Sequence, residues 1–232
     1  MPVVLEEAVA ELPAPVRRCI RRSGVVGRET PTVATVWQEG RLRQGRESRW
    51  ISFTAREEYD LDPPGFVWKA ALKLGGLTVG RATDSLAAGH GRMHVRLLGL
   101  ANVVDATGLE MDQGVVVRWL NETMWFPAVW ATDVISWEPI DETSALGSVR
   151  VGDLTVGAEF RFDHDGHLVD FRADRYRSVE SGFEMARWST PLTEHAVFDG
   201  IELPSRGCAV WALEDGDLEY IRIRATGVRC SY

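Results

Sequence analysis

A long succession of strand-like segments is the feature that most constrains the fold of this chain. From Thr32 onward, about ten or eleven short apolar-rich segments follow one another at hairpin spacing. Turn-forming residues at 62–65 and 163–166 separate some of them, and residues 154–162 alternate between apolar and polar side chains. So many strands in one flat open sheet would be unusual, and no βαβ rhythm is present. We therefore predict a mainly β (α+β) fold, a single large antiparallel β-barrel or half-barrel with residues 1–232 as one domain.

Two helical segments interrupt this pattern. The first covers residues 1–24 and is broken by prolines near its middle. The second covers residues 112–124, with Asp112 as its N-cap. Apolar residues four positions apart, such as Val115 and Trp119, give this central helix a wide apolar face. We expect it to lie against the sheet as a lid or plug that closes one side of a hydrophobic cavity.

The charge balance and the cysteines exclude several classes of protein. The net charge of −8 argues against a nucleic-acid partner, because such surfaces concentrate Lys and Arg. The three cysteines lie far apart without any Cys-x-x-Cys spacing, as in proteins of a reducing compartment. The acidic start of the chain lacks the basic region of a signal peptide, and no apolar run is long enough to span a membrane. These features predict a cytoplasmic protein without membrane insertion.

Several motifs, taken together, resemble those of a bacterial protein family. They lie at residues 38–43, 66–70, 118–127 and 137–141, and their order and spacing match over nearly the whole chain. The chain thereby resembles domain-of-unknown-function family 6544, although family members commonly carry tyrosine where this chain has Trp119. The resemblance implies a β-rich fold of one domain, similar to the open barrels of bacterial lipoprotein carriers. It implies no activity.

A charged pair on the central helix is the first candidate for chemistry. Arg118 and Glu122 lie four residues apart, so their side chains can meet on one face of the helix. An ordinary surface ion pair is one interpretation. The other is that Trp119, Trp125 and Phe126 partly desolvate Glu122, which would raise the pKa of its carboxyl and suit it to acid/base work.

A second candidate lies in the predicted strand at residues 167–176. Alternation places Asp174 and Tyr176 on one face and Arg175 on the other. If Arg175 points inward, it needs a carboxylate partner, for which Glu159 or Glu122 is available. If these residues lie on the outer face, they form a cross-strand network of salt bridges instead.

Tryptophan is abundant, with nine residues in the chain. Aromatic side chains can line a cavity for a hydrophobic ligand, or they can simply fill a large β core. The aromatic residues that we expect to contact a ligand are Trp68, Trp119, Trp125, Phe126 and Trp188. The sequence has no phosphate loop, no dinucleotide fingerprint and no metal-ligand spacing, so we expect neither a cofactor nor a metal.

These residues lead to two main hypotheses. The first is a cofactor-independent isomerase, cyclase or lyase that acts on a hydrophobic small molecule. In it Glu122 is the acid/base, Tyr176 and Asp174 are proton or hydrogen-bond partners, and Arg118 or Arg175 sets the pKa of the carboxyl. The alternative is a non-catalytic carrier of a lipid-like or polyketide-like ligand. A purely structural interaction domain is a third interpretation.

Overall fold

The computed structural model describes residues 3–97 and 101–232. In these residues fourteen strands form one antiparallel sheet, in the order β6-β5-β4-β3-β2-β1-β14-β13-β11-β10-β9-β8-β7, with β12 paired to β13. The strands are β1 (Val33–Leu42), β2 (Ile51–Leu61), β3 (Pro64–Leu74), β4 (Leu77–Ala87), β5 (His90–Leu97), β6 (Ala101–Ala106), β7 (Ile135–Pro139), β8 (Ser144–Val151), β9 (Leu154–Phe162), β10 (Leu168–Val179), β11 (Gly182–Ser189), β12 (Leu192–Phe198), β13 (Ile201–Leu213) and β14 (Gly216–Ser231).

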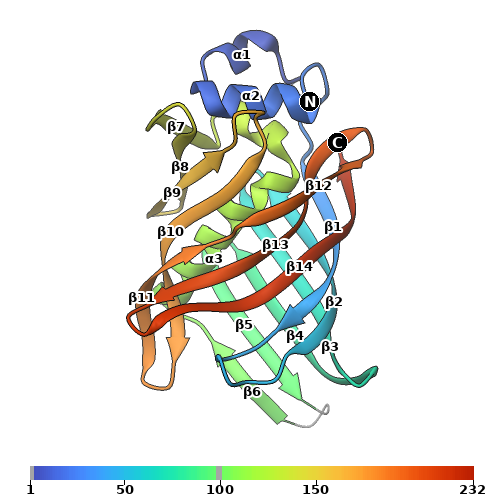
Figure 1. Cartoon of the computed structure of the whole chain (residues 1–232), viewed down its shortest axis with the longest axis vertical. Coiled ribbons are helices and arrows are strands. Elements are labelled where there is room, and N and C mark those ends of the chain that lie inside the picture. Colours follow the sequence, from blue (N-terminus) through green and yellow to red (C-terminus); the bar gives the residue numbers. More distant parts are fainter. Residues whose placement is uncertain (1–2, 98–100) are drawn as a thin grey trace.

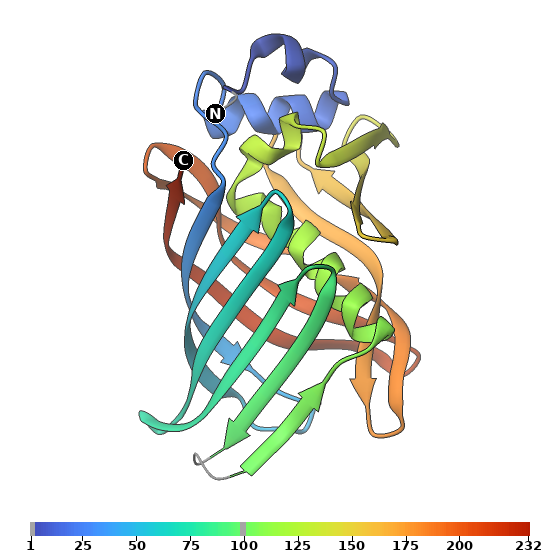
Figure 2. The ribbon, with the colours of Figure 1, turned by 180° about the vertical axis from the view of Figure 1, so that it is seen from behind.

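The sheet curls into a half-barrel that a helix completes. Its two edge strands are β6 and β7, so the sheet does not close on itself. Helix α3 (Leu109–Glu122) packs against β3, β4 and β5 on one side and against β8, β9 and β10 on the other. Figure 2 shows this helix running obliquely between the two arms of the sheet. The predicted half-barrel with a central helix is therefore confirmed.

The N-terminal helices lie across one end of the half-barrel. Helix α2 (Ala14–Ser23) contacts β8, β9, β13 and the short helix η2 (Pro127–Ala131), and α1 (Glu6–Ala10) packs on α2. Both chain termini are at this end, whereas the β1–β2 loop and the β3–β4 hairpin are at the opposite end (Figure 1). The expected helical segment at residues 1–24 is thus two helices, and Gly24 ends the second with a φ of +81°.

Alternating burial explains why the strands curl around a core. In β2, alternate residues are buried and the residues between them are exposed; the buried ones are Phe53, Ala55, Glu57, Tyr59 and Leu61. Close approach between β5 and α3 depends on Gly91. A Cβ atom there would lie 2.6 Å from a methyl carbon of Val115 and 2.9 Å from the carbonyl oxygen of Met111. The helix therefore packs directly on the backbone of the sheet.

Three expectations about the elements were wrong in detail. The central helix begins after Gly108 and not at Asp112, whose carboxylate instead accepts a hydrogen bond of 2.6 Å from the backbone N–H of Gly91. The helix ends at Glu122 and continues as the 3-10 turn η1 (Thr123–Trp125). The described residues contain fourteen strands and not ten or eleven. One reason is that Pro191, which cannot donate to a strand ladder, separates β11 from β12.

Candidate ligand cavity

A cavity of about 700 Å³ lies between the concave face of the sheet and α3. Most of its lining is apolar, and its size is within the range of small-molecule binding sites. Its apolar and aromatic lining includes Ile51, Trp68, Leu72, Ala82, Val95, Trp188, Ala209, Ile221 and Ile223. The curled sheet thus encloses a space that side chains do not fill.

The cavity opens at one end and is closed at the other. Leu74 and Leu97 line it at the end of the half-barrel where the β3–β4 hairpin lies. They are 42% and 37% exposed, so the cavity reaches the solvent there. Arg43 of the β1–β2 loop borders the same mouth. At the deep end, Glu122 and Trp125 are only 7% and 3% exposed. A ligand can therefore enter at the end opposite the N-terminal helices.

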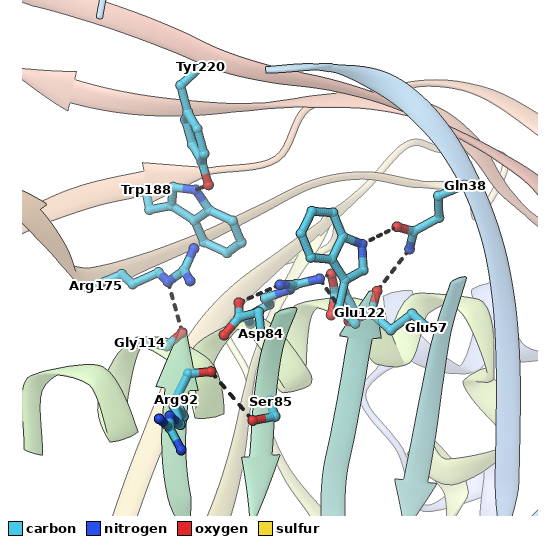
Figure 3. A network of polar contacts seen from close by, with 12 residues as sticks. Gln38, Glu57, Asp84, Ser85, Arg92, Gly114, Glu122, Arg175, Trp188 and Tyr220 are labelled. Carbon is cyan, nitrogen blue, oxygen red and sulfur yellow. Dashed lines mark hydrogen bonds and ion pairs between the residues drawn. The ribbon is translucent and has the colours of Figure 1, made fainter. Parts of the chain in front are cut away.

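A network of buried charges surrounds Arg118 on the cavity wall. Its guanidinium donates to a carboxylate oxygen of Glu57 at 2.7 Å, of Asp84 at 2.5 Å and of Glu122 at 2.9 Å. The same group lies 5.2 Å from the centre of the Trp68 ring. One cation thus holds three carboxyl groups, each of them less than a tenth exposed (Figure 3).

The network continues through Gln38 on β1. Gln38 donates to Glu57 at 2.9 Å and accepts a hydrogen bond of 2.8 Å from the indole N–H of Trp68. Glu57, Trp68 and Asp84 form one row across β2, β3 and β4, because Glu57 pairs with Trp68 and Trp68 with Asp84 in the strand register. The row therefore positions two carboxylates to meet a single arginine from the helix.

Burial changes the protonation of this network. It raises the pKa of Glu57 well above its ordinary value, although the positive charge of Arg118 acts in the opposite direction. Burial likewise raises the pKa of Glu122, again against the effect of Arg118. The charge of Arg118 therefore does not offset the desolvation of Glu57 and Glu122, and these two carboxyls keep their protons to a higher pH than exposed carboxyls do.

Comparison with known proteins identifies the family. The model of a family of unknown function, DUF6544, matches residues 2–223. The chain belongs to this family. No curated protein matches the sequence. The resemblance expected from the motifs is therefore confirmed over nearly the whole length of the DUF6544 chain.

Two solved structures are similar to this DUF6544 member. A DUF1329-family protein from Desulfovibrio piger is 10% identical, covers 94% of this chain and 93% of its own, and has a TM-score of 0.50. A LolA-superfamily protein from Nitrosomonas europaea is 9% identical, covers 95% of this chain and 94% of its own, and has a TM-score of 0.48. At these identities the likeness concerns the fold alone. In the part of the DUF6544 chain that the structure describes, no helix is long and apolar enough to cross a membrane.

The structure brings together only some of the predicted catalytic residues. Arg118 and Glu122 form the expected ion pair and both line the cavity. Arg175 also lines it, from β10. Asp174 is exposed on the other face of that strand, where it lies 3.5 Å from Arg187, and Tyr176 shares that face. Neither of these two borders the cavity, so neither is placed to exchange a proton with Glu122.

The predicted aromatic contacts divide into two groups. Trp68, Trp125 and Trp188 line the cavity. Trp119 and Phe126 do not border it and are buried in the core, where the indole N–H of Trp119 donates to the backbone carbonyl of Asp60 at 3.1 Å. The helical period of the sequence alone did not distinguish the aromatic residues that face the cavity from those that pack into the core.

Sequence reasoning missed Glu57 and Asp84, and a signal for both was present. In β2, Glu57 occupies a position in the series of alternate residues that are otherwise apolar. Asp84 does the same in β4, between Ala82 and Leu86. A single acid on the apolar side of a strand predicts a buried charge with a partner.

Proposed function

We propose that this protein binds and carries a hydrophobic small molecule in the cavity of its half-barrel. The observation that supports the proposal is a largely apolar space of about 700 Å³ that opens at one end. A folded core normally leaves few voids larger than a water molecule. A space of this size therefore favours an occupant over an unfilled interior.

The geometry around Glu122 favours carriage over the isomerase, cyclase or lyase hypothesis. One of its carboxyl oxygens is held by Arg118, and the other is completely buried, with no partner among the described residues. A general acid or base must come within hydrogen-bond reach of the substrate atom that exchanges the proton. Asp174 and Tyr176, the other expected proton partners, lie on the outer face. Carriage needs none of these groups to react.

Binding of a fluorescent hydrophobic probe tests the proposal. N-phenyl-1-naphthylamine becomes brighter in an apolar site, and we expect saturable binding at one site per chain. Replacement of Ala209 by tryptophan places a large ring in the cavity and is expected to weaken probe binding at least tenfold, because the space is then partly filled. Val197→Trp adds the same ring at an exposed position that does not line the cavity and serves as the matched control.

The results of the binding assay test the cavity and the carrier function separately. Equal probe binding by the wild type, Ala209→Trp and Val197→Trp would overturn the cavity as the binding site. No binding by the folded wild type would overturn the carrier proposal itself. Native mass spectrometry of the purified protein provides an independent readout, since a retained hydrophobic ligand adds a discrete mass that Ala209→Trp is expected to lose.

A cytoplasmic location belongs to the same proposal. All three cysteines are free thiols, which fits a reducing compartment. Cell fractionation tests the location, and recovery of the protein in the periplasmic fraction would contradict it.

A further inference from the structure

Arg175 is the one buried arginine on the cavity wall whose charge is left without a carboxylate partner in the described part of the chain. It is 9% exposed and points inward from β10 (Figure 3). Its Nε donates to the backbone carbonyl of Gly114 at 2.8 Å, and its guanidinium lies 4.5 Å from the centre of the Trp188 ring. The helix backbone and the tryptophan therefore hold the group in place. No carboxylate among the described residues lies within ion-pair distance of it, and its charge acts on Glu122 only from farther away.

The carboxylates that the sequence offered to Arg175 have other partners. Glu159 lies within ion-pair distance of Arg161 and Arg187, and Glu122 is bonded to Arg118. A guanidinium does not lose its proton in a protein, so Arg175 keeps its charge. A buried charge without a counter-ion is costly unless something else in the site compensates for it.

The two terminal nitrogens of Arg175 are the donors that a ligand can reach. Neither has a hydrogen-bond partner among the described residues, and the side chain borders the cavity. Two acceptor atoms of the Arg118 network, Asp84 Oδ1 and Glu122 Oε2, also have none, but both are completely buried. Burial also raises the pKa of Glu57 and Glu122, which reduces the repulsion that the network exerts on an incoming anion.

From this geometry we propose that Arg175 binds the acidic head group, a carboxylate or a phosphate, of an amphiphilic ligand whose apolar chain occupies the cavity. Both anions accept two parallel N–H donors from a guanidinium, which matches the two free nitrogens. Apolar residues that line the same cavity, such as Leu72 and Ile223, would contact the chain. This inference rests on the proposed carrier function and specifies its class of ligand.

Three ligands of equal chain length test the inference: hexadecanoic acid, hexadecyl phosphate and hexadecanol. The wild type is expected to bind the two anionic ligands at least about tenfold more tightly than the alcohol, since hydrogen bonds to a charged group exceed neutral ones. Arg175→Gln is expected to remove this preference and to bind the alcohol as the wild type does. Retained alcohol binding also shows that the variant is folded. Arg175→Lys keeps the charge and is expected to keep part of the preference.

Arg43→Gln is the matched control. Arg43 also lines the cavity and lies 4.7 Å from the centre of a tryptophan ring, that of Trp50, but at the mouth, where it donates to the backbone carbonyls of Glu219 and Arg46. We expect this variant to keep the preference for anionic ligands. Loss of the preference in Arg43→Gln but not in Arg175→Gln would overturn the assignment.

The remaining outcomes distinguish the inference from the function on which it rests. Equal affinity of the wild type for the acid and the alcohol would overturn the role of Arg175 and leave the carrier proposal standing. Failure of all three ligands to bind would overturn both. Inorganic phosphate alone, measured by calorimetry, tests for a site that takes a free anion. If phosphate binds as tightly as hexadecyl phosphate, the apolar chain contributes nothing and the inference fails.

Discussion

Replacement of Arg118 by methionine tests the physical account of the buried network. Methionine keeps most of the apolar stem but removes the cation that donates to Glu57, Asp84 and Glu122 at 2.7, 2.5 and 2.9 Å. Three buried carboxyl groups would then face one another without a positive charge among them. The variant therefore isolates the contribution of one guanidinium to the free energy of unfolding.

Two limits give the magnitude of the effect. Removal of one partner from a buried ion pair costs about 3–5 kcal/mol. The carboxyl groups can escape by taking up protons, and for a glutamate this costs about 3.7 kcal/mol at pH 7. We therefore expect Arg118→Met to lower the free energy of unfolding by about 4 kcal/mol at pH 7. The cost of protonation falls by about 1.4 kcal/mol per pH unit, so the loss is expected to shrink to about 2 kcal/mol at pH 5.5.

Urea denaturation followed by tryptophan fluorescence at pH 7 and pH 5.5 measures both values. Arg222→Met is the control, because Arg222 pairs with Glu219 at the surface and its loss is expected to change the free energy of unfolding very little. A loss below about 1.5 kcal/mol for Arg118→Met at pH 7 would refute the reasoning. So would an equal loss at both pH values, because the carboxyl groups would then not be taking up protons.

Three further predictions follow from other contacts. Glu122→Gln should leave probe binding unchanged. Because the pKa of Glu122 is raised in the folded state, this carboxyl stabilises the fold most at low pH and loses that contribution as the pH rises. The variant should therefore gain stability relative to the wild type between pH 5 and pH 8, and a strong loss of stability at pH 8 would contradict this. Gly91→Ala should lower the free energy of unfolding by about 1–3 kcal/mol, because the new methyl group meets Val115 and the Met111 carbonyl; an unchanged urea midpoint would contradict the close packing. Trp68→Phe should cost about 1–3 kcal/mol by leaving the Gln38 oxygen without its donor, and a neutral result in the same assay would show that this hydrogen bond contributes nothing.

The parts of the fold that depend on local sequence were predictable. Hairpin turns, alternation in β9 and the proline break between α1 and α2 follow from residues that are neighbours in the chain. The Arg118–Glu122 pair was predictable for the same reason, since helix geometry brings residues four apart together. The start of α3 was not, because Asp112 bonds to the backbone of β5, a contact that no local pattern reveals.

Which charged residues meet on the cavity wall depends on the register of strands that are far apart in the chain. Arg118 meets Glu57 and Asp84, which are 61 and 34 residues away in the chain. A shift of one residue in the register would turn both acids to the outside.

By itself, the sequence determined a curled antiparallel sheet with one helix across it and an ion pair on that helix, because strand alternation and helix periodicity are short-range properties. Only the tertiary structure decided that three carboxyl groups share Arg118, that Asp174 and Tyr176 face outward, and that Arg175 faces the cavity without a carboxylate partner among the described residues. Which charges are paired and which are open to a ligand depends on how the sheet curls around α3.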